Sequence, residues 1–139
     1  MKQEVLLDTG PLVAYLNRRD ADHAWSRGQW QQIRPPLLTS EAVLSEACFL
    51  LGEFGGDPDS VLKLVERDVI RVEFNISDNI AVVRKLMRKY RTSPMSFADA
   101  CLVRMSELYA ESVVFTLDSD FRGYRRHGRQ VIPLLVPPA

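Results

Sequence analysis

Short apolar runs recur along this chain between turn-forming residues, and each such run predicts a buried strand. The runs cover residues 4–7, 37–38, 69–74 and 112–117, and SVVFTL at 112–117 has the strongest strand character. A last strand is expected over residues 131–136. Because Pro133 lies within it and has no N–H for a central ladder, this strand is predicted at an edge of the sheet.

Longer segments with helical spacing separate these strands. We expect six helices. The first begins near Pro11, the second covers about 21–33, and the third runs from Glu41 to about 53. The fourth begins at 59–60, the fifth has Ser77 or Asp78 as its N-cap, and the sixth runs from Ser96 to about 110. Ser40 and Ser96 are the expected N-caps of two of these helices. In the second helix, Ala24, Trp25 and Trp30 are expected to contact the core.

Strands that alternate with helices imply right-handed crossovers and a parallel sheet covered on both faces. The predicted fold class is therefore α/β, a three-layer α/β/α sandwich with a central twisted parallel sheet. A length of 139 residues suits one domain, and we find no repeat, linker or low-complexity segment. We expect one domain over residues 1–139.

The chain carries 18 Lys and Arg residues and 18 Asp and Glu residues, so no net field attracts nucleic acid or an anionic membrane. Any RNA binding must use local patches. Two basic clusters are present, Arg84, Lys85, Arg88, Lys89 and Arg91 in one segment and Arg122, Arg125, Arg126 and Arg129 in another. Charge alone favours a structural interpretation, in which the first cluster is a solvated helix face and the second a basic loop.

Two cysteines, Cys48 and Cys101, lie in apolar segments without metal-ligand spacing, and we expect both to be small buried hydrophobic residues. No apolar run approaches the length of a membrane span, and the first ten residues are too short and too acidic for a signal peptide. We therefore expect a cytoplasmic protein without membrane contact.

Two aspartates come directly after predicted strands. Asp8 ends the first strand, and Asp118 follows the strongest one. Both belong to the carboxyl edge of the sheet, where open α/β folds bind ligands. A structural role is the alternative for each, since Asp8 can serve as a turn residue or helix cap and Asp118 can begin an Asx turn.

Two further acids interrupt apolar helical segments, Glu46 in AVLSEACFLL and Asp99 in MSFADACLV. A carboxylate there must be solvated, paired or bound to a cation, because isolated burial is costly. No basic residue is placed one helical turn away. As alternatives, Glu46 can lie on an exposed stripe with Glu53, and Asp99 can complete a capping box with Ser96.

Several carboxylates gathered without bases repel one another, and a hard divalent cation is the usual remedy. Magnesium or manganese fits better than zinc, because His23 and His127 are isolated and no Cys or His cluster exists. No nucleophilic triad motif is visible. A cation held by carboxylates can activate water and stabilise charge on a phosphodiester, which indicates hydrolysis of RNA or DNA.

Four blocks, VLLDTGPLVAYL, TSEAVLSEACFLL, SFADACLVR and VFTLDSDF, resemble the PIN domain in order and over nearly the whole chain. At this length the resemblance is to the small bacterial and archaeal members that include VapC-type toxins of toxin–antitoxin pairs. It implies a twisted parallel sheet between helices, a pocket that binds Mg2+ or Mn2+, and endonucleolytic cleavage of RNA by metal-activated water.

The resemblance also implies a set of site residues. Its catalytic and metal-binding acids fall on Asp8, Glu46, Asp99 and Asp118, and its accessory positions on Asp120, Thr9 and Thr116. Glu41 competes with Glu46 in the same block. Glu41 lies in the first helical turn, where the helix dipole alone explains a negative charge, whereas the family pattern has its acid within the apolar stretch, which selects Glu46.

The partners that the resemblance implies are an RNA substrate, a cognate antitoxin and a second copy of the chain in a homodimer. As a hypothesis from charge, Arg84, Arg88 and Arg91 contact phosphates on one rim of the site and Arg122, Arg125 and Arg126 on another.

Two other functions compete with a nuclease. A catalytically silent PIN-like module that binds RNA or protein would keep the fold without activity. An aspartyl-phosphate phosphatase or receiver domain also has aspartates at a sheet edge, but Asp8 is followed by Thr, Gly and Pro, and no lysine lies beyond Lys89.

Overall fold

Five short strands form a single parallel sheet in the computed structural model, which describes residues 3–138. The strands are β1 (Glu4–Leu7), β2 (Leu37–Thr39), β3 (Ile70–Val72), β4 (Ser112–Phe115) and β7 (Leu134–Leu135), in the order β3-β2-β1-β4-β7. Every pairing is parallel. The sheet order confirms the predicted edge position of the last strand, where the missing N–H of Pro133 interrupts no central ladder.

Side chains alternate between the two faces of the sheet, so the register determines which helices they meet. Leu6 pairs with Val114 and Leu7 with Phe115 across β1 and β4. The Phe115 ring contacts Trp25 and Trp30 of α2 (His23–Gln32), with ring centroids 5.7 and 6.2 Å apart. This face of the sheet therefore packs on α2, and Leu6 and Val114 point to the other face.

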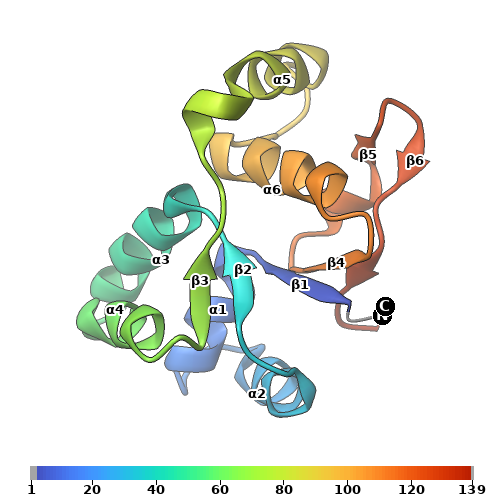
Figure 1. The fold of residues 1–139 in the computed structure, drawn as a ribbon. Coiled ribbons are helices and arrows are strands. Elements are labelled where there is room, and N and C mark those ends of the chain that lie inside the picture. Colours follow the sequence, from blue (N-terminus) through green and yellow to red (C-terminus); the bar gives the residue numbers. More distant parts are fainter. Residues whose placement is uncertain (1–2, 139) are drawn as a thin grey trace.

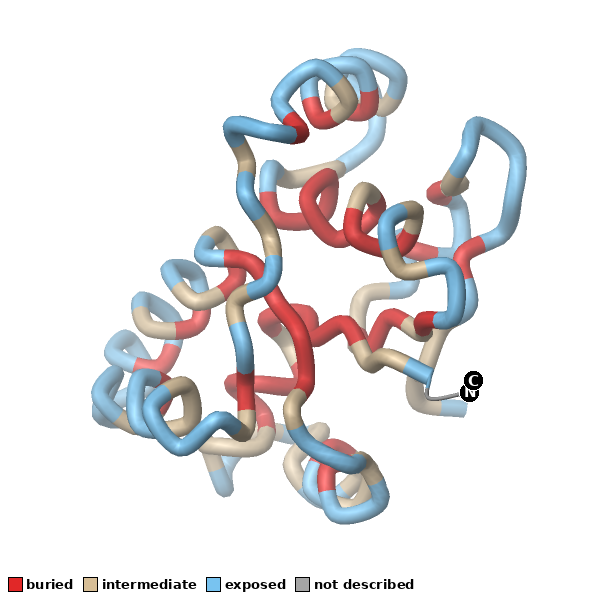
Figure 2. Tube along the Cα trace, viewed as in Figure 1, coloured by how far each residue is buried: buried red, intermediate tan, exposed pale blue. Residues whose placement is uncertain are grey.

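Within the described range, six α-helices flank the sheet, which confirms the predicted α/β/α sandwich (Figure 1). Besides α2 they are α1 (Thr9–Leu16), α3 (Glu41–Glu53), α4 (Asp59–Glu66), α5 (Ile76–Lys89) and α6 (Phe97–Leu108). Helix α6 contacts β1 and β4 and carries α5 on its outer side, whereas α1 packs against α2 and α3. The two helix layers bury the apolar strands between them (Figure 2).

Several local predictions were wrong. The N-cap of α5 is Asn75, whose side chain accepts the Asp78 N–H, and not Ser77 or Asp78. Ala24 is exposed and Ser26 is the buried small residue of α2. Both errors have one origin, because an amphipathic pattern tolerates a shift of one or two residues before its apolar face is lost.

The two cysteines differ in burial. Cys101 is buried within α6, as expected, whereas Cys48 is only partly buried on α3. The expectation for Cys48 was wrong because the apolar segment that contains it turns part of its surface outward, as the exposure of the next residue, Phe49, shows.

The predicted last strand is divided in two. Residues Gln130–Val131 form β6, which pairs antiparallel with β5 (Arg125–Arg126) in a separate hairpin, and only β7 joins the main sheet. A short 3-10 helix, η1 (Ser119–Arg122), connects β4 to this hairpin. The hairpin was not predicted, since its sequence is a run of arginines without strand alternation.

Among residues 3–138, no helix has both the length and the apolar character that crossing a membrane requires.

Candidate active site

Asp8 lies at the junction of β1 and α1 and is 6% exposed. Its backbone N–H continues the sheet by donating to the Phe115 carbonyl, 3.0 Å away. Its side chain is the N-cap of α1, with Oδ1 accepting the Thr9 N–H at 2.8 Å. The structural role considered for Asp8 is therefore real, and it fixes the carboxylate at the carboxyl edge of the sheet.

Asp118 follows β4 on the neighbouring strand and caps η1, with Oδ1 accepting the Asp120 N–H at 2.8 Å. The buried Thr116 hydroxyl links it to Asp8, because Oγ1 donates to Asp8 Oδ2 at 2.7 Å and accepts the Asp118 N–H at 2.9 Å. Gly10 allows this approach of α1 to the end of β4, since a Cβ at position 10 would lie 3.2 Å from the Leu117 side chain.

Asp99 occupies the first turn of α6 and is 7% exposed. It completes a capping box, in which Ser96 Oγ accepts the Asp99 N–H and Asp99 Oδ2 accepts the Ser96 N–H. The same Oδ2 accepts the hydroxyl of buried Tyr124 at 3.3 Å. Within residues 3–138, the second oxygen of this carboxylate accepts no hydrogen bond, so it remains available to a ligand.

Glu46 reaches the site from α3 through Thr9, whose hydroxyl donates to Glu46 Oε2 at 3.0 Å. The burial argument made for this acid from sequence was wrong, since Glu46 is exposed, as is Glu53. Helix α3 looks buried in sequence because apolar residues surround Glu46, yet Phe49 on the same helix is 66% exposed. Glu46 is thus a rim residue held by one hydrogen bond.

The three aspartates interact electrostatically. Burial raises the pKa of Asp8 from 3.8 to about 6, against the hydrogen bonds from Thr116 and Thr9, and the charges of Asp99 and Asp118 raise it further. The pKa of Asp99 is also raised, first by burial and then by the Asp118 charge. Repulsion from Asp118 raises the pKa of exposed Asp120. These carboxylates therefore share one negative field that a cation would relieve.

The oxygen donors suit a hard divalent cation, although no three Asp, Glu, His or Cys side chains in the described part of the chain stand close enough together to enclose one. Mg2+ does not need such a cage, since it keeps several waters and is commonly held by one or two carboxylates together with substrate phosphates. The buried Asp8 and Asp99, each with raised pKa, fit that requirement. His23 Nδ1 instead lies 2.7 Å from the Ala14 carbonyl, which ties α2 to α1.

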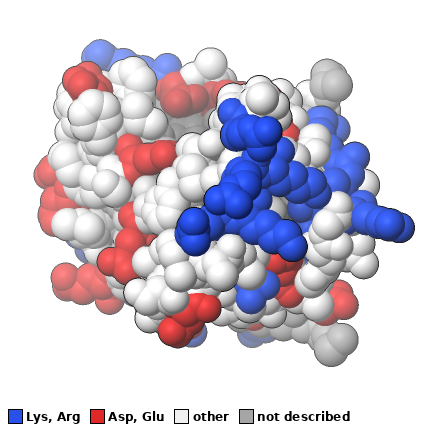
Figure 3. Space-filling model, turned by 90° about the horizontal axis from the view of Figure 1, so that it is seen from above, with Lys and Arg blue, Asp and Glu red and all other residues white. Residues whose placement is uncertain are grey.

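Lys and Arg side chains gather in a continuous patch on the face of the molecule drawn in Figure 3. Exposed Arg84 and Arg88 come from α5, and exposed Arg91 and Arg122 follow α5 and Asp118 respectively. Arg126 is half-buried, and its guanidinium donates to the Ser106 carbonyl at 2.9 Å, close to the end of α6. One end of this guanidinium therefore closes a helix terminus.

Tyr124 is a site residue that the sequence did not indicate. It lies between Phe121 and Tyr90, with both ring centroids 5.1 Å from its own, and its hydroxyl reaches Asp99. The only signal in the sequence is an aromatic residue among arginines six positions after Asp118. Such a residue is equally common in a plain hydrophobic contact, so contact with Asp99 could not be inferred.

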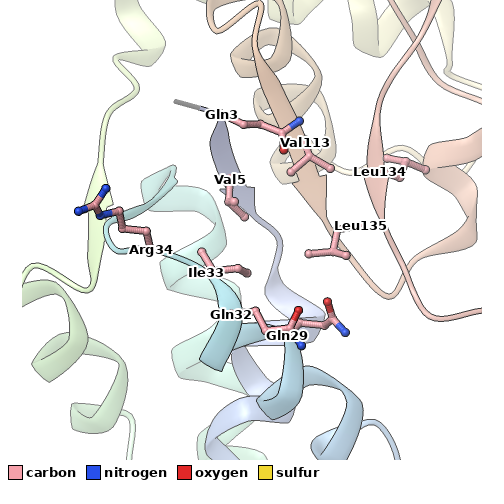
Figure 4. A pocket seen from close by; sticks show the side chains of 9 residues that line it. All are labelled: Gln3, Val5, Gln29, Gln32, Ile33, Arg34, Val113, Leu134 and Leu135. Carbon is pink, nitrogen blue, oxygen red and sulfur yellow. The ribbon is translucent and has the colours of Figure 1, made fainter. Parts of the chain in front are cut away.

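A cavity of 350 Å³ lies far from these acids, between the end of α2 and the beginnings of β1 and β4 (Figure 4). Its floor is apolar and includes Val5 and Val113, and Gln29, Gln32 and Arg34 line its rim. The acids of the site follow the opposite ends of the same strands. Because the described residues that line this cavity include no acid, histidine, cysteine or serine, it does not compete as a catalytic site.

The chain matches the PIN domain family over residues 5–126. Among solved structures it is similar to the crystal structure of VapC20 from Mycobacterium tuberculosis, which is described as a sarcin-ricin loop cleaving toxin. The two chains are 23% identical, the TM-score is 0.78, and the match covers 86% of this chain and 94% of the other. At this identity the likeness concerns the fold. A comparison with curated proteins found no match.

Proposed function

This chain belongs to the PIN domain family, and from that premise and the geometry of its acids we propose that it is a Mg2+- or Mn2+-dependent endoribonuclease, the toxin of a toxin–antitoxin pair. One observation carries the proposal. Asp8, Asp99 and Asp118 come from three separate stretches and lie near one another at the carboxyl edge of the sheet, where burial first and then the charge of Asp118 raise the pKa of Asp8 and Asp99. Groups that repel in this way are typical of a site built for a cation.

In the proposed mechanism Asp8 and Asp99 would hold the cation, and Asp118 and Glu46 would be the further acids of the site. When bound, the cation lowers the pKa of a coordinated water and offsets charge on the phosphodiester. The Thr116 hydroxyl fixes the orientation of Asp8, and the Thr9 hydroxyl draws Glu46 toward the site. Asp120 adds negative charge at the rim as an accessory acid.

The test of this function is RNA cleavage together with metal binding. We expect Mn2+ to stabilise the protein by RT ln(1 + [L]/Kd), which is about 2.7 kcal/mol at 100 times Kd. We also expect cleavage of single-stranded RNA or of a stem-loop of the sarcin-ricin type, the RNA named for the structural neighbour, to require the metal. A fold without either response would leave the silent binding module as the better proposal.

Glu46 and Glu41 provide a matched pair on α3. Glu46→Gln should lower cleavage by roughly 10- to 100-fold, the range found when a supporting group of a metal site is removed. Glu41→Gln removes the same charge at an exposed position in the first turn of that helix, and should change cleavage less than about two-fold. Initial cleavage rates at saturating Mn2+ measure both. Equal losses of cleavage rate in the two variants would show that the total charge of α3 matters and that Glu46 has no specific role.

Arg84, Arg88, Arg91 and Arg122, here called the basic surface, are proposed to hold RNA phosphates. Replacing Arg88 and Arg91 with Ala should weaken RNA binding and reduce the slope of log K against log salt by about 1.4, since each single-strand phosphate contact contributes about 0.7. The matched control replaces Arg18 and Arg67, which are exposed and lie outside the basic surface on the α1–α4 side. Fluorescence anisotropy with labelled RNA in EDTA measures binding without cleavage. An unchanged slope would mean that these arginines are only solvated.

A homodimer, an antitoxin partner and a cytoplasmic location belong to the same proposal. Support for a protein partner comes from large apolar side chains that remain exposed on and after α3 and on α4, namely Phe49, Phe54 and Leu62. These three residues are 52–66% exposed, and such groups on a small domain are typical of surfaces that are covered in an assembly.

A further inference from the structure

A second cavity, of 270 Å³, adjoins the acids at the carboxyl edge of the sheet. Two segments line it: Tyr90, Ser93 and Pro94 follow α5, and Ser119, Asp120 and Tyr124 follow Asp118. Two of its residues contact the acids of the candidate active site: the Tyr124 hydroxyl donates to Asp99, and the Asp120 N–H donates to Asp118. An RNA strand with a phosphate at the acids therefore has this cavity beside it.

The walls of the cavity are suited to a flat ring. Tyr90 is half-buried and offers ring surface to the cavity, and behind it the buried Tyr124 ring packs against it with centroids 5.1 Å apart and planes inclined by 65°. Phe121 supports Tyr124 from the core at 5.1 Å, and the Tyr90 hydroxyl accepts the Arg125 N–H at 3.0 Å. The Tyr90 ring is thus held in place before any ligand arrives, which lowers the entropic cost of stacking a base against it.

The polar groups of the cavity exclude a phosphate and favour N–H donors. Asp120 lines the cavity and is exposed, so its carboxylate can accept hydrogen bonds from a ligand. Together with Asp118, which its own N–H contacts, it repels an anion. Exposed Ser93 and Ser119 add hydroxyls that donate or accept. A neutral planar ligand with N–H groups on its edge fits this combination.

We propose that this cavity binds one nucleobase of the RNA next to the cleaved bond, and that it selects bases with amino groups. Guanine, adenine and cytosine each present an N–H2 group to the Asp120 carboxylate, and guanine adds the N1–H beside it. Uracil presents one N–H between two carbonyl oxygens, which the carboxylate repels. The inference rests on the proposed ribonuclease function for its biological meaning, but the binding itself requires neither metal nor cleavage.

The experiment titrates the 15N-labelled full chain in EDTA with GMP, AMP, CMP, UMP and ribose 5-phosphate. We expect the amides of Ser93, Ser119 and Gly123 to shift with GMP, AMP and CMP, and with UMP at least about five-fold more weakly, on a millimolar scale. Ribose 5-phosphate should leave these amides unchanged. The inference is overturned if ribose 5-phosphate shifts them as strongly as GMP, or if no nucleotide shifts them.

Two variants separate the contributions. Tyr90→Ala should weaken GMP binding about ten-fold by removing the stacking surface, and Tyr90→Phe should restore most of it because the ring is kept. Asp120→Asn should bring the affinities for GMP and UMP close together, since an amide can donate to uracil carbonyls. An unchanged GMP preference in Asp120→Asn contradicts the assignment even if Tyr90→Ala fails to fold. Nucleotide binding without RNA cleavage would reject the ribonuclease and keep the base site, and cleavage without nucleotide binding would do the reverse.

Discussion

Asp8→Asn is expected to lower RNA cleavage by at least about 100-fold and, at the same time, to stabilise the metal-free protein at about pH 7.5. The first effect follows from loss of a central ligand, because removal of a mere outer partner of a metal site already costs roughly 10- to 100-fold. The second follows from burial. With its pKa raised from 3.8 to about 6, Asp8 is ionised at neutral pH in a place that disfavours its charge.

The pH dependence of this effect has a definite sign. Asp8 binds its proton more tightly in the folded than in the unfolded chain, so its contribution to stability is fully present below pH 3.8 and is lost as the pH rises through about 6. The shift corresponds to roughly 3 kcal/mol at about 1.36 kcal/mol per pKa unit. The amide of the variant avoids that cost but points an N–H2 group at Thr116, whose hydroxyl also accepts the Asp118 N–H.

The net gain for Asp8→Asn is therefore about 1–2 kcal/mol above pH 7, or about 3–8 °C in Tm for a chain of this size. Thermal melts in EDTA between about pH 4 and pH 8 should show the wild type and the variant converging at the acid end and separating above about pH 6. A variant that is less stable than the wild type at neutral pH would contradict the assignment of a strained buried charge. The same melts with Mn2+ should stabilise only the wild type.

Asp99→Asn is expected to reduce cleavage to a similar degree, by at least about 100-fold, with little change in fold. An Asn oxygen can still accept the Ser96 N–H and the Tyr124 hydroxyl, so the capping box survives while the charge is lost. Initial cleavage rates and Mn2+-induced thermal shifts measure the loss. Cleavage by this variant at the wild-type rate would point to a contaminating nuclease.

Ser96→Ala is the matched control for Asp99. It removes the hydroxyl that accepts the Asp99 N–H and should cost about 1 kcal/mol of stability, as other N-cap replacements do. The Asp99 carboxylate remains, so cleavage should fall by no more than a few-fold. If Ser96→Ala were as inactive as Asp99→Asn, cleavage would depend on the geometry of the first turn of α6 more than on the charge of Asp99.

The fold and the approximate place of the site could be predicted because they depend on local patterns. Continuous apolar runs mark buried parallel strands, Ser40 and Ser96 mark helix starts, and acids directly after strands must lie at the carboxyl edge. The common position of Asp8 and Asp118 at one edge of the sheet follows directly, because β1 and β4 are parallel neighbours. Their assignment as metal ligands stays a prediction.

Other features depend on contacts between distant residues. The Thr116 hydroxyl binds a carboxylate 108 positions away, and Tyr124 binds one 25 positions away, so no local pattern encodes either bond. The exposure of Glu46 and Glu53 was one of two alternatives that the sequence left open, because α3 is apolar around most of its circumference and its sequence does not show which side faces the core. The hairpin of β5 and β6 was not predicted, because its arginine-rich sequence lacks the alternation of apolar and polar residues that indicates a strand.

The candidate acids also hold the ends of helices, and this limits how the chain can lose activity. Asp8 caps α1, Asp118 caps η1 and Asp99 closes the capping box of α6. A residue that cannot accept a hydrogen bond at one of these positions releases a backbone N–H as well as removing the charge, and each lost cap costs about 1 kcal/mol of stability. Small hydrogen-bonding replacements such as Asn or Ser keep an acceptor and remove only the charge. Mutations that remove one of these acids without weakening the domain are therefore largely confined to such residues.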